Sequence, residues 1–407
     1  MNSICSNRFC RALIAAMLVV AAFEFLPEAR AFFGGDVAQP NGETLNSTNA
    51  APKAIPRRAS IILIVADGLG YGDLSCYGQT KFQTPNLDKL AAEGIRFTNY
   101  FANYSSLSSQ EALMAGFLSV QTTGYTNGSS YGVSVFYDYG ISVAQLLKNS
   151  GYHTGLIGEW SLGDENSSGA PWKKGFDEFA GYLNSKDAEN FYADYIWRYA
   201  PKSIYNETNG QMDTFNDRET LYANSGGKKG QYVPDVCTKA ALNFIKNNQP
   251  DEFNHYQPFF LLLNYAVPKA GMPVPTDAPF SGEAWPQPEK NQAALISRLD
   301  GYVGELQEQL LKLGMTNNAV IFFTSGSTAQ KAGGVDPEFF HGNISTNDLR
   351  VPMIVHWPER ILAGQVSGFK WSPQDFLPTA AEIAFTKTPA TIDGNSILPV
   401  LLGQAKK

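Results

Sequence analysis

The feature that most constrains the fold is a series of short, almost entirely apolar runs separated by amphipathic helical patterns. The runs are Ile61–Ala66, His153–Ile157, Pro258–Tyr265, Ala319–Thr324 and Val351–His356. The helical patterns are Asn86–Glu93, Ser142–Lys148, Asp235–Lys246 and Ala293–Leu313. Strands without polar alternation are typical of sheets that are covered on both faces. We therefore predict an α/β fold, with a central, mostly parallel sheet and helices on both faces.

Length and charge narrow the class of protein. The 407 residues, of which 43% are hydrophobic, can bury a large core in one large domain or two smaller ones. The formal net charge of −7 and the lack of basic runs argue against nucleic acid as a partner.

The N-terminus has the pattern of a targeting segment. Arg8 and Arg11 precede the apolar stretch Ala12–Phe23, and Ala29-Arg30-Ala31 offers a cleavage site. The apolar stretch is too short to span a bilayer. We predict a signal peptide at residues 1–31, export to the periplasm or the extracellular space, and no membrane span after cleavage.

Composition divides the remaining chain. Residues 32–59 are rich in Gly, Asn, Pro, Thr and Ala and are predicted to form a linker, before one domain at 60–403. Within this domain the alternation of apolar runs and helical patterns is lost at 182–232, an aromatic-rich insertion that we interpret as a long surface loop. Its aromatic side chains either pack the loop onto the sheet or form a platform for sugar rings.

Removal of the signal peptide would leave two cysteines, Cys76 and Cys237. In an exported protein they could form a disulfide. Two free thiols fit the sequence equally well.

Several motifs, in the same order along the chain, closely resemble the sulfatase family. They are Ile61–Gly78, Thr84–Asp88, Ser106–Gly116, Gly151–Gly163, Gly175–Phe179, Arg350–Val355, Asp375–Thr379 and Asp393–Pro399. The resemblance covers most of the chain from Ser60 to Gly403 and implies an alkaline-phosphatase-like α/β fold. Because the sequence ends soon after Gly403, we expect the family's small C-terminal antiparallel subdomain to be truncated.

The resemblance also implies a metal site, but this sequence lacks most of the carboxylates that the family uses as metal ligands. Sulfatases use a calcium ion, which prefers six to eight oxygen ligands, several of them charged. The family's Asp-Asp pair corresponds to Asp67-Gly68, and its second acidic block corresponds to Thr324–Thr328, which contains no carboxylate. Asp67 and Ser327 are therefore expected to be vestigial metal positions.

The catalytic positions implied by the resemblance are mostly substituted. Ser106 occupies the position of the nucleophile, which the family converts to formylglycine. The motif's Pro and Arg are Ser108 and Gln110, the next motif's Lys and His are Glu159 and Ser161, a later His is Lys269, and a late Lys falls on His341. Glu159 is the most adverse change, since a negative charge about 5 Å from an anionic substrate costs about 3 kcal/mol at an effective dielectric of about 20.

These observations favour an exported sulfatase homologue that is catalytically impaired and binds a sulfated or other glycan, or another partner. The alternative is an active sulfatase that uses Ser106 in a non-standard site, and a structural protein without a ligand is a third hypothesis. We expect no cofactor in the first case and calcium in the second.

Two structural expectations follow. Asp67, Ser106, Gly326 and Ser327 should meet at the C-terminal edge of the sheet, where sites form in open α/β sheets. The Lys269 ammonium should reach Asp67 or Glu159, because buried charges persist only when they are paired or hydrogen-bonded.

Overall fold

The computed structural model describes residues 58–118, 141–206, 211–329, 331–336, 338–339 and 349–404, all within the unit Pro56–Lys407. The predicted signal peptide, nearly all of the predicted linker, and His341 lie outside the described residues.

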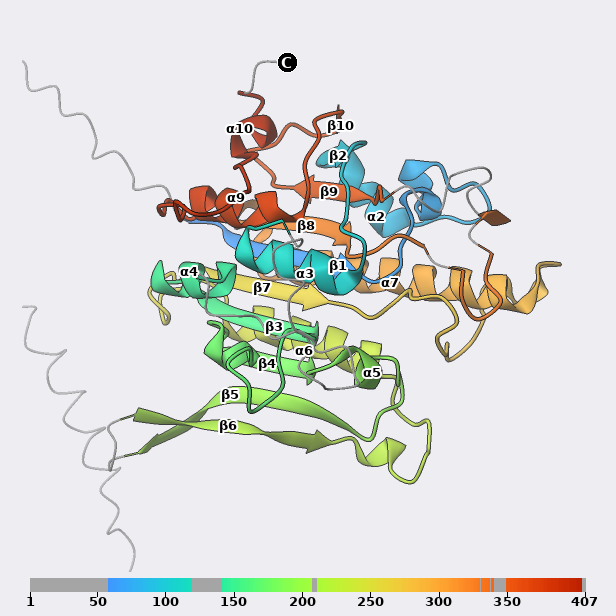
Figure 1. Ribbon diagram of the computed structural model, residues 1–407, viewed down its shortest axis with the longest axis horizontal. Coiled ribbons are helices and arrows are strands. Elements are labelled where there is room, and N and C mark those ends of the chain that lie inside the picture. The colour runs from blue at the N-terminus through green and yellow to red at the C-terminus, as the bar shows by residue number, and fades with distance from the viewer. Residues whose placement is uncertain are drawn as a thin grey trace, which may run out of the picture. The chain divides into compact units, whose positions relative to one another are not determined.

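The centre of the described region is one ten-stranded sheet in the order β10-β2-β9-β8-β1-β7-β3-β4-β5-β6 (Figure 1). The strands are β1 Ser60–Ala66, β2 Ile95–Phe97, β3 His153–Glu159, β4 Glu178–Tyr182, β5 Tyr195–Asn206, β6 Gln211–Thr220, β7 Phe259–Asn264, β8 Ala319–Ser325, β9 Met353–His356 and β10 Gln365–Ser367. The predicted apolar runs therefore form strands.

The middle of the sheet is parallel. β1 pairs in parallel with both β7 and β8, and β3 pairs in parallel with β7 and β4. Antiparallel pairs occur toward the two edges, where β9 joins β8 to β2 and the β5–β6 hairpin joins β4. This confirms the mostly parallel sheet, and it places the C-terminal ends of β1, β3, β7 and β8 along one edge.

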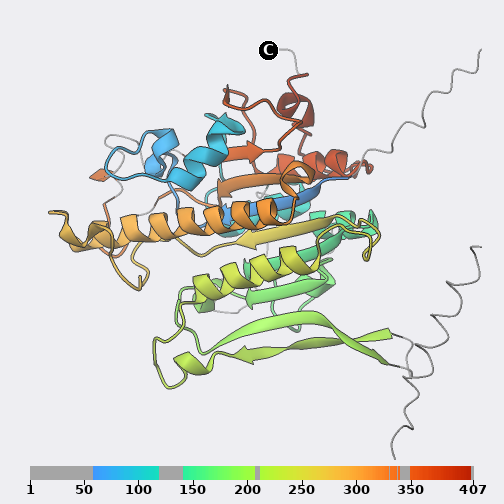
Figure 2. The ribbon, with the colours of Figure 1, turned by 180° about the vertical axis from the view of Figure 1, so that it is seen from behind.

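Helices cover both faces, as predicted. They are α2 Pro85–Ala92, α3 Ser106–Ala115, α4 Val143–Asn149, α5 Ser185–Ala188, α6 Val233–Asn247, α7 Gln287–Lys312, α9 Phe376–Ile383 and α10 Leu398–Leu401. Helices α3, α4 and α9 lie on the face seen in Figure 1, and α6 and α7 on the opposite face in Figure 2.

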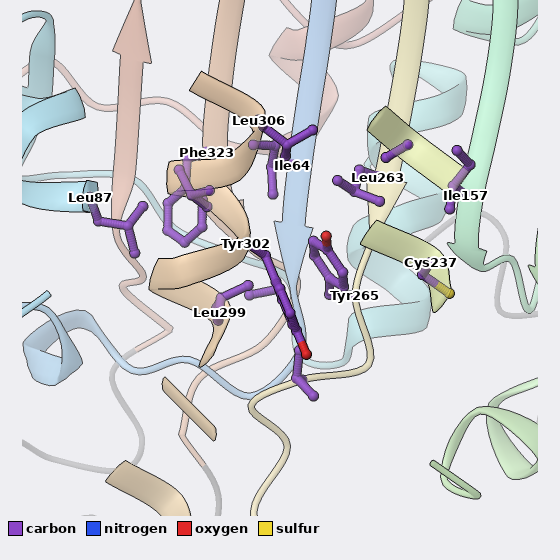
Figure 3. Packing of buried hydrophobic residues seen from close by; sticks show 14 of the residues in the cluster. Ile64, Leu87, Ile157, Cys237, Leu263, Tyr265, Leu299, Tyr302, Leu306 and Phe323 are labelled. Carbon is purple, nitrogen blue, oxygen red and sulfur yellow. The ribbon is translucent and has the colours of Figure 1, made fainter. Parts of the chain in front are cut away.

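Two buried apolar clusters hold these layers together, one on each face of the sheet. Side chains alternate across β1: Ile64 packs toward α7, with Leu263, Leu306 and Phe323 (Figure 3), and Leu63 packs on the other side with Leu262. Burial on both faces explains why β1 contains no polar alternation.

The interpretation of 182–232 as a long loop was wrong. The middle of this segment forms the long antiparallel strands β5 and β6, which extend the sheet, with Trp197 opposite Arg218. Among its described side chains, those of residues 214–220 on β6 are exposed and most of those of residues 195–200 on β5 are half-buried, so the strands lack the continuous apolar runs that mark the buried ones. The aromatic residues Tyr195, Trp197 and Tyr199 of β5 nevertheless recur with period two, which is a signal of a half-buried strand.

Two further expectations can be compared with the described residues. Cys76 and Cys237 are free thiols and do not form a disulfide. None of the helices in the described part of the chain is long and apolar enough to cross a membrane.

Candidate functional site

The sequence-predicted site residues meet where the parallel strands end. Asp67 directly follows β1, Ser327 follows β8, Glu159 is the last residue of β3, and Ser106 is the first residue of α3. The β7 strand leads through a short turn to Lys269.

Two hydroxyl groups bind the Asp67 carboxylate. Ser106 Oγ donates a hydrogen bond to Asp67 Oδ1, and Ser327 Oγ donates to the same oxygen at 2.8 Å. The Gly68 amide donates to Ser327 Oγ at 3.1 Å, which fixes this hydroxyl between the two loops. A Cβ added at Gly326 would lie 3.3 Å from Ser106 Oγ, so glycine allows the close approach. The expected convergence of Asp67, Ser106, Gly326 and Ser327 is confirmed.

The Lys269 ammonium lies beside the other Asp67 oxygen. Its Nζ is 3.8 Å from Asp67 Oδ2 and 2.8 Å from Glu189 Oε1. Burial by itself would lower the pKa of Lys269, but the hydrogen bond that its ammonium donates to Glu189 and the charges of Asp67, Glu189 and Glu159 outweigh it, so the pKa is raised. Lys269 therefore stays protonated. The expected pair with Asp67 is present, and Glu189, at the end of α5, is a partner that the sequence did not indicate.

The loop at Gly68 is shaped around Lys269. Gly68 has φ +77°, in the left-handed region that favours glycine, and a Cβ added there would lie 3.2 Å from the Lys269 Cα. The position at which the resemblance implies a second aspartate therefore favours glycine, because the Lys269 backbone lies so close to it.

Glu159 adds a second carboxylate at this edge of the sheet. Burial, followed by the charge of Asp67, raises its pKa to about 7, although the hydrogen bond from Ser161 acts in the opposite direction. Ser161 Oγ donates to Glu159 Oε1 at 2.7 Å. The Glu159 carbonyl accepts from Gln110 Nε2 at 3.0 Å and from Asn264 Nδ2 at 2.8 Å.

Two of the substituted positions therefore form hydrogen bonds to Glu159, which is itself a substituted position. Gln110 is buried and donates to the backbone of Glu159, and Ser161 donates to its side chain. Ser108 closes the N-terminus of α3 through a reciprocal cap with Ser105. Asn264 was missed by sequence reasoning, although a polar residue that ends an apolar strand is a signal for this edge.

This donor set does not fit calcium. Both hydroxyl protons near Asp67 point at its carboxylate, and an ammonium lies close to the second oxygen. A dication at Asp67 would meet that positive charge and would find too few charged oxygens. Among the described residues no group of three or more His, Cys, Asp or Glu side chains could hold a metal ion.

Comparisons with known proteins agree with the fold and the motif order. The family model described as Sulfatase matches residues 59–386. N-acetylgalactosamine-6-sulfatase of Sus scrofa is 30% identical over 377 residues, covering 88% of this chain and 69% of the relative. Arylsulfatase A of Homo sapiens is 31% identical over 372 residues, covering 88% and 70%.

Solved structures give the same result. The crystal structure of Ps i-CgsB in complex with k-i-k-neocarrahexaose is similar to this chain with a TM-score of 0.65 and 26% identity, over 85% of this chain and 77% of the other.

Proposed function

This chain belongs to the sulfatase family, and we propose that it is a catalytically impaired, exported member that binds a glycan. The observation that carries the proposal is the internal neutralisation of Asp67. Its two oxygens are engaged by the Ser106 and Ser327 hydroxyls and by the Lys269 ammonium.

The same contacts oppose each step that a sulfate-ester hydrolase needs. The negative charge of Asp67 is already balanced by the Lys269 ammonium, so Asp67 would attract a metal ion only weakly. Glu159, whose pKa is raised to about 7, presents negative charge above that pH where an anionic group would approach. Developing charge on a transferred group needs fixed cations, whereas three carboxylates and one ammonium gather here.

The glycan part of the proposal rests on one face of the β5–β6 hairpin. Tyr195, Trp197 and Tyr199 occupy alternate positions of β5 and thus share a face. The Arg218 guanidinium lies over the Tyr195 ring at 4.5 Å and the Trp197 ring at 5.3 Å, and Trp172 stacks on Tyr199 at 5.2 Å. Flat rings and an exposed guanidinium suit a sugar chain that carries anionic groups. The Ps i-CgsB structure contains a carrageenan-type oligosaccharide.

Export is supported by the N-terminal sequence, in which Arg8 and Arg11 precede an apolar stretch and an Ala-x-Ala site. The compartment that follows is the periplasm or the extracellular space.

A second candidate function is sulfate-ester hydrolysis through Ser106. In its favour, the Ser106 hydroxyl still stands at the first residue of α3, in contact with Asp67, and the relatives above are named as sulfatases.

Turnover of p-nitrophenyl sulfate and of sulfated monosaccharides by the purified mature protein, with and without added calcium, separates the two. We expect no hydrolysis above the buffer background. Turnover that is lost in Ser106→Ala would contradict the impaired site and establish the second candidate.

A further inference from the structure

A second candidate binding site lies at the end of the sheet opposite to Asp67, where four parallel strands begin. A cavity of about 450 Å³ opens there, within the usual size range of ligand pockets. Of its lining residues, Arg58 precedes β1, Gly151 precedes β3 and Asn318 precedes β8. The others belong to the loop 250–258, which leads from α6 into β7. Asp67 lies beyond the far end of β1, so the length of that strand separates the two sites.

The loop 250–258 has an unfavourable backbone conformation where it lines this cavity. His255 and Tyr256 have φ +57° and +58°, in the left-handed region that residues with a side chain disfavour. No other two adjacent residues apart from glycines have positive φ in the described part of the chain. Both side chains are exposed, so packing of the core does not explain the conformation. Strained backbone of this kind is concentrated at functional sites and ligand clamps.

The cavity is lined by a cation and by no carboxylate. The chain as a whole is acidic, with 38 Asp and Glu against 31 Lys and Arg, yet none of the described acidic residues lines this cavity. Two cavities beside α7 differ in this respect, since Glu305 lines both. The Arg58 guanidinium donates to the Ser150 carbonyl and pairs with no carboxylate of the described residues. Arginine has five N–H donors, so four remain for a ligand.

Neutral hydrogen-bonding groups and an aromatic ring complete the lining. The side chains of His255, Gln257 and Asn318 form no hydrogen bond with the described residues, so their donors and acceptors are available to a ligand. A side-chain amide both donates and accepts, which suits the hydroxyl groups of a ligand. The half-exposed Tyr256 and Pro250 add apolar surface against which a carbon ring can pack.

We propose that this cavity binds a small hydroxylated organic anion, of the size and chemistry of an acidic monosaccharide. The Arg58 guanidinium holds the oxyanion through paired N–H donors. The carbon ring of the ligand lies against Tyr256, and its hydroxyl groups bond to the Gln257 and Asn318 amides. A carboxylate, a sulfate ester and a phosphate ester share this chemistry. The inference is independent of the glycan-binding face on the β5–β6 hairpin and of the Asp67 site.

Calorimetric titration of the mature protein tests the proposal with glucuronate, glucose 6-sulfate and glucose 6-phosphate, each compared with glucose. The titrations are made at low ionic strength, because Arg58 is exposed and salt would screen its charge. We expect at least one of the three acids to bind at least about tenfold more tightly than glucose. The acid that binds most tightly identifies the oxyanion that the cavity prefers. Absence of binding by all three acids, or binding no tighter than that of glucose, would overturn the proposal.

Charge variants locate the site. Arg58→Gln removes the cation and should weaken binding of the acid at least about tenfold. Asn318→Asp has nearly the same size but places a carboxylate in the lining, and it should weaken binding about threefold or more. Arg360→Gln is the matched control, because Arg360 is also exposed but does not line the cavity. Unchanged affinity in Arg58→Gln and Asn318→Asp would contradict the assignment, and a loss in Arg218→Gln alone would place the acid on the hairpin.

A further variant, His255→Gly, tests the link between the strained loop and binding. Glycine adopts a φ of +57° readily, so this variant should unfold thermally at the same temperature as the wild type or higher. Because the imidazole is lost from the lining, we expect binding of the acid to weaken about threefold or more. Unchanged affinity would show that the loop conformation does not serve a ligand and would contradict the proposal.

Discussion

The Lys269 ammonium lies 3.8 Å from Asp67 Oδ2 and 2.8 Å from Glu189 Oε1, so one side chain joins the end of β1 to the end of α5. The resemblance to the sulfatase motifs implies a histidine at the position of Lys269. The cation at this edge of the sheet is therefore supplied by the chain itself, and the loop at Gly68 is shaped to accommodate it.

Removing that cation should destabilise the fold. In Lys269→Met the partly buried Asp67 and Glu159 carboxylates lose their neutralising partner, and we expect a loss of about 1–3 kcal/mol in the free energy of unfolding at pH 8. Urea denaturation measures it. Lys312→Met is the control, because Lys312 pairs with Glu308 on the exposed surface of α7 and its loss should have little effect. Equal effects of the two substitutions on the free energy of unfolding would show that Lys269 does not stabilise the fold by neutralising Asp67 and Glu159.

Glu159 should make stability depend on pH. Its pKa is raised from 4.5 to about 7 in the folded protein, chiefly by burial and by the charge of Asp67. The folded state therefore binds the proton more tightly than the unfolded state, and this stabilisation is complete below about pH 4.5 and is lost as the pH rises to about 7. At pH 8, Glu159→Gln should exceed the wild type in stability by up to about 3 kcal/mol.

At pH 5 the same two proteins should differ much less, because Glu159 is then mostly protonated. Urea denaturation at both pH values gives the comparison. If the difference in the free energy of unfolding between wild type and Glu159→Gln is the same at pH 5 and pH 8, the pKa of Glu159 is not raised by folding.

Restoring the missing aspartate should not restore calcium binding. Gly68→Asp introduces a Cβ 3.2 Å from the Lys269 Cα, on a backbone with φ +77°. Gly227→Asp is the matched control, with φ +79° and no atom within 4 Å of the added Cβ. Both changes carry the left-handed penalty of about 1–2 kcal/mol, and Gly68→Asp should lose measurably more stability. Calcium-dependent stabilisation of Gly68→Asp in thermal unfolding would refute this reasoning.

Glycan binding should depend on one face of the hairpin. Trp197→Ala and Arg218→Ala remove a ring and the guanidinium above it, and each should weaken binding of a sulfated carrageenan oligosaccharide by about tenfold. Arg198→Ala is the control, since Arg198 is adjacent to Trp197 in the strand, points to the other face and pairs with Glu219 at 3.1 Å. Calorimetry or a glycan-affinity gel distinguishes the faces, and equal losses from Arg198→Ala and Arg218→Ala would indicate non-specific charge attraction.

The sequence predicted the five central strands of the sheet, β9, β8, β1, β7 and β3, and much of the candidate site, for a physical reason. A strand buried on both faces, such as β1, must be a continuous apolar run, and the residue that follows it, Asp67, must lie at the edge where neighbouring strands also end. The convergence of Asp67, Ser106 and Ser327 could be deduced from that geometry and the family resemblance together.

The hairpin and Glu189 could not be deduced in the same way. Strands β5 and β6 interrupt their apolar residues with polar ones, and only the period-two recurrence of Tyr195, Trp197 and Tyr199 and the later Asn209-Gly210 pair favour a hairpin. Glu189 follows the single-turn helix α5, and its approach to Lys269 depends on how distant loops pack, which no local pattern encodes.

The central claim, that Asp67 is neutralised by Lys269 and by hydroxyl groups in place of a metal ion, is tested most directly by the calcium content of the protein. The mature protein should be equilibrated with millimolar calcium, desalted and measured by plasma mass spectrometry. We predict well below about 0.1 calcium ion per chain, because the oxygens at this site are too few and already engaged. A content of about one ion per chain that falls to zero in Asp67→Asn would contradict the account.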